Sequence, residues 1–346
     1  MNVLLTSAGR RNYLVQWFSQ ALARTGEPGR VYVADCDRRV PAQAAADGFI
    51  HLPGCRSAGY LTVLARECAR YEISLLVPLH DHELSALAGE PTAILQAAGT
   101  RALTPGYDQH RAVEDKYSFS LLATAAGIAT PDTRLGSELL SSSAGDDLGP
   151  ELVVKHRYGN GSSGLIFCTA KDVPGHIRSS ALTAPDEFGR PRSDGAAPDY
   201  DLVVVQPRIR GVEYGIDAVG DFDGRHLACL ARRKLNMRAG ETDRAVTVDP
   251  RPFSDTGRRI ATAIGARGLI DIDAIVDAEG RSWVIDVNPR FGGGYPFNHL
   301  AGADVPACYV AWNRNAEHDP KWLVARPGVT GAKYEALTTV TGSDRD

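Results

Sequence analysis

Residues 269–294 have the sequence LIDIDAIVDAEGRSWVIDVNPRFGGG, in which polar and apolar residues alternate on both sides of a short turn. Residues 277–280, Asp-Ala-Glu-Gly, are typical of a turn, and the alternating segments beside them predict a β-hairpin. With those four residues as the loop, Val276 pairs with Arg281 and Asp271 pairs with Asp286. The alternation then divides the hairpin into a face for chemistry and a face for the core. The first carries Asp271, Asp273, Asp286 and Asn288, and the second carries Ile270, Ile272, Val276, Trp283, Ile285 and Val287.

The polar face of this hairpin predicts a site for a divalent cation. Carboxylate and amide oxygens on rigid strands are the hard ligands that Mg²⁺ prefers, and such a metal keeps positions open for phosphate oxygens and water. A metal held there would neutralise charge on a phosphate during transfer. Arg290 and the glycines 292–294 follow directly, and an arginine fork beside glycine-rich backbone suits carboxylate or phosphate oxygens. The alternative is the solvated polar face of an amphipathic hairpin.

A second stretch, residues 151–168, predicts a phosphate-binding loop. Lys155 ends a strand rich in β-branched residues, and residues 159–164 read Gly-Asn-Gly-Ser-Ser-Gly. Because this loop has few Cβ atoms, its backbone N–H groups can approach phosphates closely, with the lysine ammonium as counter-charge. It is not a Walker loop, since the lysine precedes the glycines. A flexible turn is the alternative for the loop, and an ordinary helix-surface lysine is the alternative for Lys116.

The segment after this loop indicates a nucleoside site. The strand at residues 203–207 runs into a loop, and Glu213 follows Gln206 by seven residues. A carboxylate can accept hydrogen bonds from both hydroxyls of a ribose, and a hinge between strand and loop offers backbone groups to an adenine edge. A basic run follows, with a solvated basic face as the alternative to a polyphosphate contact. The run consists of Arg232, Arg233, Lys234 and Arg238.

The first 106 residues predict a parallel sheet. Strand candidates at residues 3–5, 31–34 and 75–78 alternate with helical stretches at residues 13–24 and 60–71. In such sheets the loops after the strands form the ligand crevice. Among them, His80 and His82 allow a metal-site interpretation, but no third ligand is identifiable, and a substrate-facing loop is favoured. Glu241, much later in the chain, faces either the acceptor substrate or solvent.

Composition narrows the class of protein. The chain has 346 residues, a net charge of −4, 43% hydrophobic and 23% charged residues, which is typical of a globular protein with two or three lobes. A nucleic-acid surface would need a basic excess, so nucleic acid is not expected as a partner. The opening residues predict neither a signal peptide nor a membrane helix, and a cytoplasmic protein is expected. The six cysteines are scattered and predict neither disulfides nor structural zinc.

The order of these elements resembles the ATP-grasp superfamily, in particular the ATP-binding module of carbamoyl-phosphate synthetase large chains and the stand-alone amino-acid ligases similar to it. The resemblance covers nearly the whole chain, and its most specific part is Asp-Val-Asn-Pro-Arg-Phe-Gly-Gly-Gly at residues 286–294. It implies an α/β protein with the ATP-grasp fold. A pre-ATP-grasp domain with a parallel sheet would span residues 1–106, and two α+β lobes enclosing the nucleotide would span 107–335. The lid would occupy about 135–206, and residues 336–346 would form a flexible tail.

The resemblance also implies roles for the matching residues. The nucleotide contacts would be Lys116, Lys155, the flap Gly161, Ser162, Ser163 and Gly164, the hinge Gln206, Pro207, Arg208 and Ile209, and the ribose ligand Glu213. The magnesium ligands would be Asp273, Asp286 and Asn288. The catalytic residues would be Arg290, Lys155 and Lys234. The family more often has Glu at the positions of Asp286 and Gln206, and the shorter Asp286 changes the reach of one metal ligand.

The function implied is ligation of a small carboxylate to an amine. ATP with Mg²⁺, or Mn²⁺ as an alternative, would activate the carboxylate as an acyl phosphate, and the amine would then displace phosphate. A small-molecule kinase using the same ATP site is the first alternative. A dinucleotide-dependent oxidoreductase is another, although residues 7–11 lack a full G-x-G-x-x-G. A nucleotide-binding subunit without chemistry is a third, and a homodimer is left open.

Overall fold

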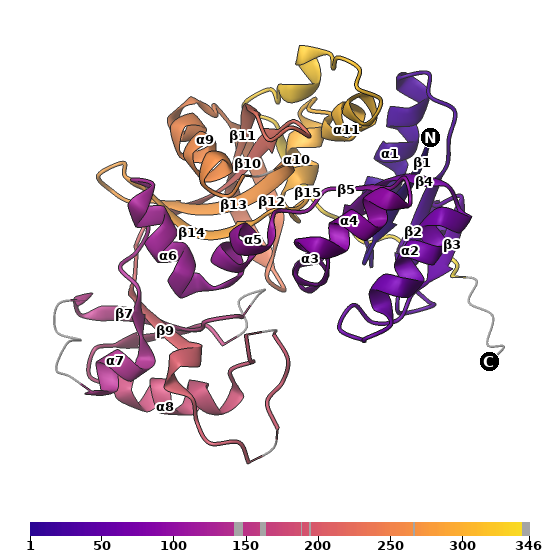
Figure 1. Cartoon of the computed structure of the whole chain (residues 1–346). Helices are drawn as coiled ribbons and strands as arrows, with labels where there is room; N and C mark the ends of the chain where they lie inside the picture. Colours follow the sequence, from indigo (N-terminus) through magenta and orange to yellow (C-terminus); the bar gives the residue numbers. More distant parts are fainter. Residues whose placement is uncertain (142–147, 160–163, 188, 194, 266, 341–346) are drawn as a thin grey trace.

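A computed structural model of the chain describes residues 1–141, 148–159, 164–187, 189–193, 195–265 and 267–340. The described residues form three sheets, each in its own lobe, and Figure 1 shows the front lobe, the central sheet and a smaller lobe beside it. The site predicted from the sequence lies where these three parts meet.

The front lobe contains a parallel sheet of five strands in the order β3-β2-β1-β4-β5. Its helix α1 buries one apolar stripe, which explains why it packs against the sheet. The order reverses between β1 and β4, so the loops after these two strands flank a crevice. The elements are β1 (Asn2–Thr6), α1 (Asn12–Arg24), β2 (Val31–Asp35), β3 (Gly48–His51), α2 (Tyr60–Arg70), β4 (Ile73–Pro78), α3 (Asp81–Leu87), α4 (Glu90–Ala97) and β5 (Arg101–Ala102).

Two helices, α5 (Tyr107–Glu114) and α6 (Lys116–Ala125), lead from the front lobe to the smaller lobe. The smaller lobe has an antiparallel sheet in the order β6-β9-β7-β8, with its apolar side covered by α7 and α8. Its elements are β6 (Arg134–Leu135), α7 (Gly136–Ser141), β7 (Glu151–His156), β8 (Ile166–Thr169), α8 (Val173–Thr183) and β9 (Val203–Pro207).

The central sheet has six strands in the order β14-β13-β10-β11-β12-β15. One face packs against α6 and α9 around Ile216, Ile260 and Ile272, and the opposite face carries the polar residues of the site. The elements are β10 (Val212–Gly220), β11 (His226–Arg238), β12 (Glu241–Val248), α9 (Ser254–Ala263), β13 (Gly268–Val276), β14 (Ser282–Asn288), α10 (Tyr295–Leu300), α11 (Val305–Asn313) and β15 (Thr330–Ala332).

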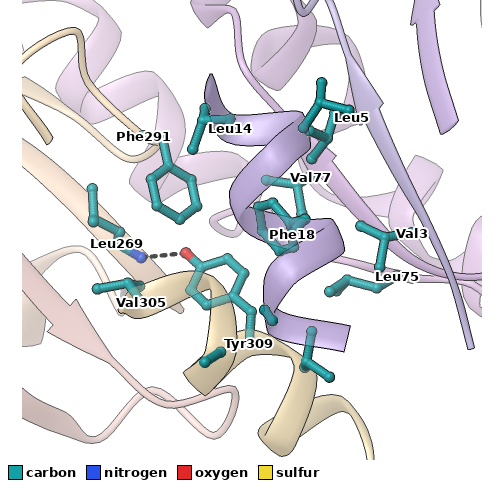
Figure 2. Packing of buried hydrophobic residues seen from close by; sticks show 14 of the residues in the cluster. Val3, Leu5, Leu14, Phe18, Leu75, Val77, Leu269, Phe291, Val305 and Tyr309 are labelled. Carbon is teal, nitrogen blue, oxygen red and sulfur yellow. Dashed lines mark hydrogen bonds between the residues drawn. The ribbon is translucent and has the colours of Figure 1, made fainter. Parts of the chain in front are cut away.

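An aromatic core joins the front lobe to the central sheet. Phe18 of α1 packs edge-on against both Phe291 and Tyr309, as Figure 2 shows. The buried Tyr309 hydroxyl accepts a hydrogen bond of 2.6 Å from the backbone N–H of Leu269, the second residue of β13. This contact ties β13, which carries Asp271 and Asp273, to α11, and α11 in turn packs against α1 of the front lobe.

The predicted strands and helices of the front lobe are confirmed, whereas the predicted register of the hairpin was wrong. Val276 pairs with Ser282 instead of Arg281, and Asp273 rather than Asp271 pairs with Asp286. Two causes act together: the loop has five residues, and a bulge follows, at which Ile285 is the extra residue of β14. The bulge moves Ile285 from the predicted core face to the cavity, and Val284 is buried in the core instead.

Candidate active site

A single cavity of about 480 Å³ contains the side chains that the sequence predicted for the site. It lies between the polar face of the central sheet, the β7–β9 part of the smaller lobe and the loops of the front lobe. Gly164 is not among its lining residues, and Gly161, Ser162 and Ser163 lie outside the described residues. The predicted residues that do line it are Lys116, Lys155, Gln206, Pro207, Arg208, Ile209, Glu213, Lys234, Asp273, Asp286, Asn288 and Arg290.

The acidic wall of the cavity comes from β13 and β14. Asp273 lies opposite Asp286, and Asp271 lies opposite Asn288. The Asn288 amide donates a hydrogen bond of 3.0 Å to Asp286 Oδ2, which orients both side chains. Lys234 Nζ, on β11, lies 2.7 Å from Asp273 Oδ1. Burial raises the pKa of Asp273 to about 6, and the neighbouring carboxylates add to this effect while Lys234 opposes it.

These oxygens fit a hard divalent cation. Asp273 and Asp286 supply carboxylates on adjoining strands, and Asn288 supplies an amide oxygen beside them. Asp273 is partly neutralised by Lys234, and the nearby Asp271 and Asp286 leave an excess of negative charge that a cation would balance. Within the described ranges, no group of three or more His, Cys, Asp or Glu side chains is arranged to hold a metal, so two carboxylates and an amide are the candidate set.

Two lysines approach the cavity from the opposite side. Lys116 begins α6 and its ammonium donates a hydrogen bond to the Gly159 carbonyl, while Lys155 lies on β7. Burial, with a smaller contribution from the nearby Lys116 and against the opposing effect of Asp286, lowers the pKa of Lys155 to about 8. Two neighbouring lysines suit a polyanion, because an anion between them would offset the repulsion of like charges and favour the charged form of Lys155.

The remaining end of the cavity forms a mostly apolar slot beside the predicted hinge. Its walls come from both sheets, and a flat, uncharged ring would bury its faces there. The Gln206 side chain does not reach into the slot, because it donates a hydrogen bond of 2.8 Å to Thr133 Oγ1 and is buried. At this position, the backbone groups of the hinge are therefore the ones that can contact an adenine edge. The apolar lining residues are Val153, Leu165, Phe167, Ile209, Ile275 and Ile285.

Arg290 connects the central sheet to the front lobe. Its guanidinium forms a bidentate pair with the Asp81 carboxylate, with hydrogen bonds of 2.6 and 2.7 Å. Asp81 starts α3, directly after His80, which also lines the cavity, whereas His82 does not. The backbone N–H of His82 donates to His80 Nδ1 at 3.2 Å, so this pair caps a helix. This arrangement favours the substrate-facing interpretation of the loop over a metal site.

The sequence interpretation missed a buried ion pair network on the polar face. Arg232, which is 1% exposed, contacts Asp217 Oδ2 at 2.8 Å and Asp271 Oδ1 at 2.6 Å. Asn298 of α10 donates a hydrogen bond of 2.7 Å to the same Asp217 carboxylate. Of the basic run, Arg232 and Lys234 line the cavity, whereas Arg233 is exposed and does not. The available signal was Asp217, an acid between the buried apolar residues Ile216 and Ala218 of β10.

The glycines around this network have a steric role. A Cβ at Gly294 would overlap with the Arg232 guanidinium, and a Cβ at Gly292 would overlap with the Asp271 carboxylate. On the other side, a Cβ at Gly215 would lie 2.6 Å from Arg232 Cζ. The glycine-rich end of the segment at residues 286–294 therefore makes room for an internal arginine, in addition to lining the cavity.

Comparisons with known protein families agree with this geometry. Residues 3–102 match the family model described as the PylC-like N-terminal domain, and residues 199–339 match the model described as ATP-grasp in the biosynthetic pathway with Ter operon. A D-alanine–D-alanine ligase from Gloeobacter violaceus is 27% identical over 183 residues, which are 50% of this chain and 58% of the relative. The chain thus spans less than two thirds of the length of that relative.

Solved structures share the fold at low sequence identity. Biotin carboxylase from Campylobacter jejuni superposes with a TM-score of 0.72 at 15% identity, covering 94% of this chain and 73% of the other. N5-carboxyaminoimidazole synthetase from Staphylococcus aureus gives 0.67 at 13% identity, covering 92% and 78%. The biotin carboxylase domain of Hydrogenobacter thermophilus 2-oxoglutarate carboxylase, solved with MgADP, gives 0.68 at 14% identity, covering 92% and 70%.

The chain has the fold of these ATP-grasp structures, residues 199–339 match an ATP-grasp family model, and the fold class predicted from the sequence is confirmed. Its matched relatives include a ligase that joins two amino acids, by its name, and structures bound to adenine nucleotides. Across the described residues, no helix has the length and apolar character needed to cross a bilayer.

Proposed function

We propose that the protein is an ATP-dependent ligase that joins a small carboxylate, such as an amino acid, to an amine through an acyl phosphate. One observation carries the proposal. Two lysines, Lys116 and Lys155, face two carboxylates, Asp273 and Asp286, across one cavity that continues into an apolar slot. This is the charge pattern that a metal-bound polyphosphate with an attached base requires. The ligase name of the Gloeobacter relative supports the amino-acid substrate class.

The reaction requires two steps, because a carboxylate has no good leaving group. A carboxylate is a poor acyl donor because its leaving group would be oxide, so a carboxylate oxygen first attacks the γ-phosphorus of ATP and ADP departs. The amine then attacks the carbonyl carbon of the acyl phosphate, and the C–O bond breaks to release inorganic phosphate while the nitrogen loses a proton. Neither step needs a protein nucleophile. The protein contributes alignment and electrostatic stabilisation.

Each residue has a place in this scheme. Lys116 and Lys155 hold the phosphates, Glu213 binds the ribose, and backbone groups at the hinge meet the adenine edge. Asp273, Asp286 and Asn288 would hold Mg²⁺, which supplies charge neutralisation to the phosphate when bound. Arg290, already fixed by Asp81, stabilises charge on the transferring phosphoryl group. Lys234 lies between Asp273 and Glu213, at 2.7 and 3.8 Å, and can turn toward a phosphate.

Several finer assignments stay predictions. These are the domain limits at 106 and 335, the lid at about 135–206, the use of Mn²⁺, a homodimeric state, the absence of nucleic-acid or membrane partners and a cytoplasmic location. The described part of the tail, residues 336–340, contains no helix or strand. The lid assignment is supported by the position of β7 and β9 over the lysine side of the cavity.

The test is a screen of amino acids, singly and in pairs, for release of ADP and phosphate in the presence of Mg-ATP. Hydroxylamine is added in parallel, because it converts an acyl phosphate into a hydroxamate. A ligase gives substrate-dependent ADP release and a hydroxamate, and Asp286→Asn reduces turnover by at least about 100-fold while the circular dichroism spectrum is unchanged. A stable phosphorylated product without a second substrate would instead assign a kinase.

A further inference from the structure

The cavity has a second polar end that the nucleotide scheme does not use. It lies at the front lobe, where the strand order of the parallel sheet reverses between β1 and β4. The loops after these strands contribute Arg11 and His80, and the β11–β12 turn contributes Glu241 from the opposite side. Crevices of this kind, at the carboxyl ends of strands where the order reverses, are the usual ligand sites of open parallel sheets.

Arg11 is a cation without a carboxylate partner. Throughout the part of the chain that the structure describes, it takes part in no salt bridge; its Nη1 makes a long hydrogen bond of 3.4 Å to the Ser7 carbonyl, and its side chain also contacts the Tyr13 hydroxyl. Its Nε is buried and has no hydrogen-bond partner there. The three other arginines of the cavity differ, because Arg290 pairs with Asp81, Arg232 pairs with two carboxylates, and Arg208 lies over the Phe167 ring. Arg11 therefore has no carboxylate to neutralise its charge and keeps N–H groups that can donate to an anion.

The loop that carries Arg11 is held in an unusual conformation. Ser7 has a φ of 52°, in the left-handed region that side chains other than glycine rarely adopt, and Gly9 has a φ of 54°. The Gly9 N–H donates to Asp35 Oδ2 at 3.3 Å, which holds the loop against the neighbouring strand. Strained backbone of this kind persists where surrounding structure enforces it, and it is concentrated at ligand sites.

Glu241 supplies the opposite charge on the facing wall. Its carboxylate lies against Gly293, where an added Cβ would lie 3.1 Å from Glu241 Cδ, and it accepts a hydrogen bond of 2.9 Å from Lys333 Nζ. Burial acts to raise the pKa of Glu241, but Lys333, with smaller contributions from Arg11 and Arg10, holds it below its ordinary value. The carboxylate is therefore charged at neutral pH, and half of its side chain is exposed to the cavity and solvent, at 51%.

We infer that this end of the cavity binds an amino acid, with the carboxylate of the substrate on Arg11 and its ammonium group on Glu241. The inference rests on the proposed ligase function and specifies the substrate class of the same site. Opposite charges on two walls select a molecule that carries both charges. A plain carboxylic acid would be repelled by Glu241, and a plain amine would leave Arg11 unpaired and be repelled by it.

The experiment compares three probe sets: the twenty common amino acids, their des-amino carboxylic acids and their decarboxylated amines. ADP release is measured with Mg-ATP for the wild type, Arg11→Gln and Glu241→Gln. The matched control is Arg10→Gln, which removes an exposed neighbouring charge outside the cavity. Arg11→Gln is expected to raise the KM of the amino acid by about tenfold or more and to leave the KM of ATP unchanged. Glu241→Gln is expected to reduce the preference for amino acids over des-amino acids.

The outcomes separate this inference from the proposed function. Equal turnover of amino acids and des-amino acids by the wild type, or an unchanged amino-acid KM in Arg11→Gln, overturns the inference while the ligase proposal stands. If no probe stimulates ADP release, the amino-acid assignment is overturned, and calorimetric binding of Mg-ADP then decides separately whether the nucleotide site stands. If Arg10→Gln raises the amino-acid KM as much as Arg11→Gln does, the loss of any nearby positive charge is sufficient to weaken binding. The inference is then also overturned.

Discussion

Two cations that lie two residues apart on β11, Arg232 and Lys234, point to the same face of the central sheet but stand in different surroundings. Arg232 is 1% exposed and lies between two carboxylates, with glycines making the space on both sides. Lys234 is 6% exposed, but it contacts Asp273, whose side chain is 27% exposed, and lies near Glu213, whose side chain is 47% exposed. The two carboxylates around Arg232 leave no room for a ligand, whereas Lys234 can exchange its carboxylate partner for one.

This difference separates the part of the polar face that maintains the fold from the part that binds. A buried, hydrogen-bonded pair is expensive to break because the remaining charge stays in a medium of low dielectric constant. A pair with exposed partners costs little to open, because water replaces the lost contact. The variants below test this division.

Replacement of Arg232 by Met should give the largest effect, on stability. Asp217 and Asp271 would be left buried without a counter-charge, and a loss of about 3–5 kcal/mol in the free energy of unfolding is expected. Urea denaturation followed by circular dichroism measures it. Arg233→Met, on the exposed side of the same strand, should change stability by less than about 0.5 kcal/mol. Equal losses in the two variants would contradict the division.

Replacement of Lys234 by Met should affect turnover much more than stability. Lys234 is itself buried but its partners are partly exposed, so the free energy of unfolding should fall by about 1–3 kcal/mol, less than in Arg232→Met. The rate of ADP release should fall by about 100-fold, because one cation near the transferring phosphate is lost. A stability loss comparable to that of Arg232→Met, with turnover intact, would show that both cations are structural.

Gly294→Ala should have an intermediate effect on stability. The added Cβ would overlap with the Arg232 guanidinium, and displacing a buried ion pair should cost about 1–3 kcal/mol. Gly175→Ala, in α8, is the control, because its Cβ would meet no atom within 4 Å and the change should remain within about 1 kcal/mol. The same urea denaturation distinguishes them, and an unaffected Gly294→Ala protein would show that the network has room to move.

The smallest expected effect is a proton taken up on nucleotide binding. Because the pKa of Lys155 is lowered to about 8, part of the lysine is neutral at pH 8.5, and a polyphosphate favours its charged form. Mg-ADP binding should therefore take up as much as about one proton per site at pH 8.5, and affinity should fall as the pH rises further. Calorimetry in two buffers of different ionisation enthalpy measures the uptake. Lys155→Met should abolish it and Lys171→Met should not; retention by Lys155→Met would assign it elsewhere.

Much of the site could be predicted because two-residue alternation is a property of the strand itself. It placed Asp271, Asp273, Asp286 and Asn288 on one face, and the structure confirms that placement. The pairing across the hairpin was predicted incorrectly, because the loop has five residues and a bulge at Ile285 follows, and both depend on how the strands pair in the assembled sheet.

Contacts between distant segments could not be predicted in the same way. The pairing of Arg290 with Asp81 joins residues 209 positions apart, and only the docking of the front lobe brings them together. The network of Asp217, Arg232 and Asp271 likewise requires three strands in register. In both cases, the residue types indicated a charge, while the partner that neutralises it was determined by tertiary structure.

The central claim is that one cavity holds a metal-bound nucleotide between the carboxylates of β13–β14 and the lysines of β7 and α6. A crystal structure with Mg²⁺ and a non-hydrolysable ATP analogue tests it most directly. The account predicts metal bound by Asp273, Asp286 and Asn288, phosphates within hydrogen-bond reach of Lys116 and Lys155, and the base in the apolar slot. A nucleotide bound outside this cavity, or a metal held without both strands, would contradict it.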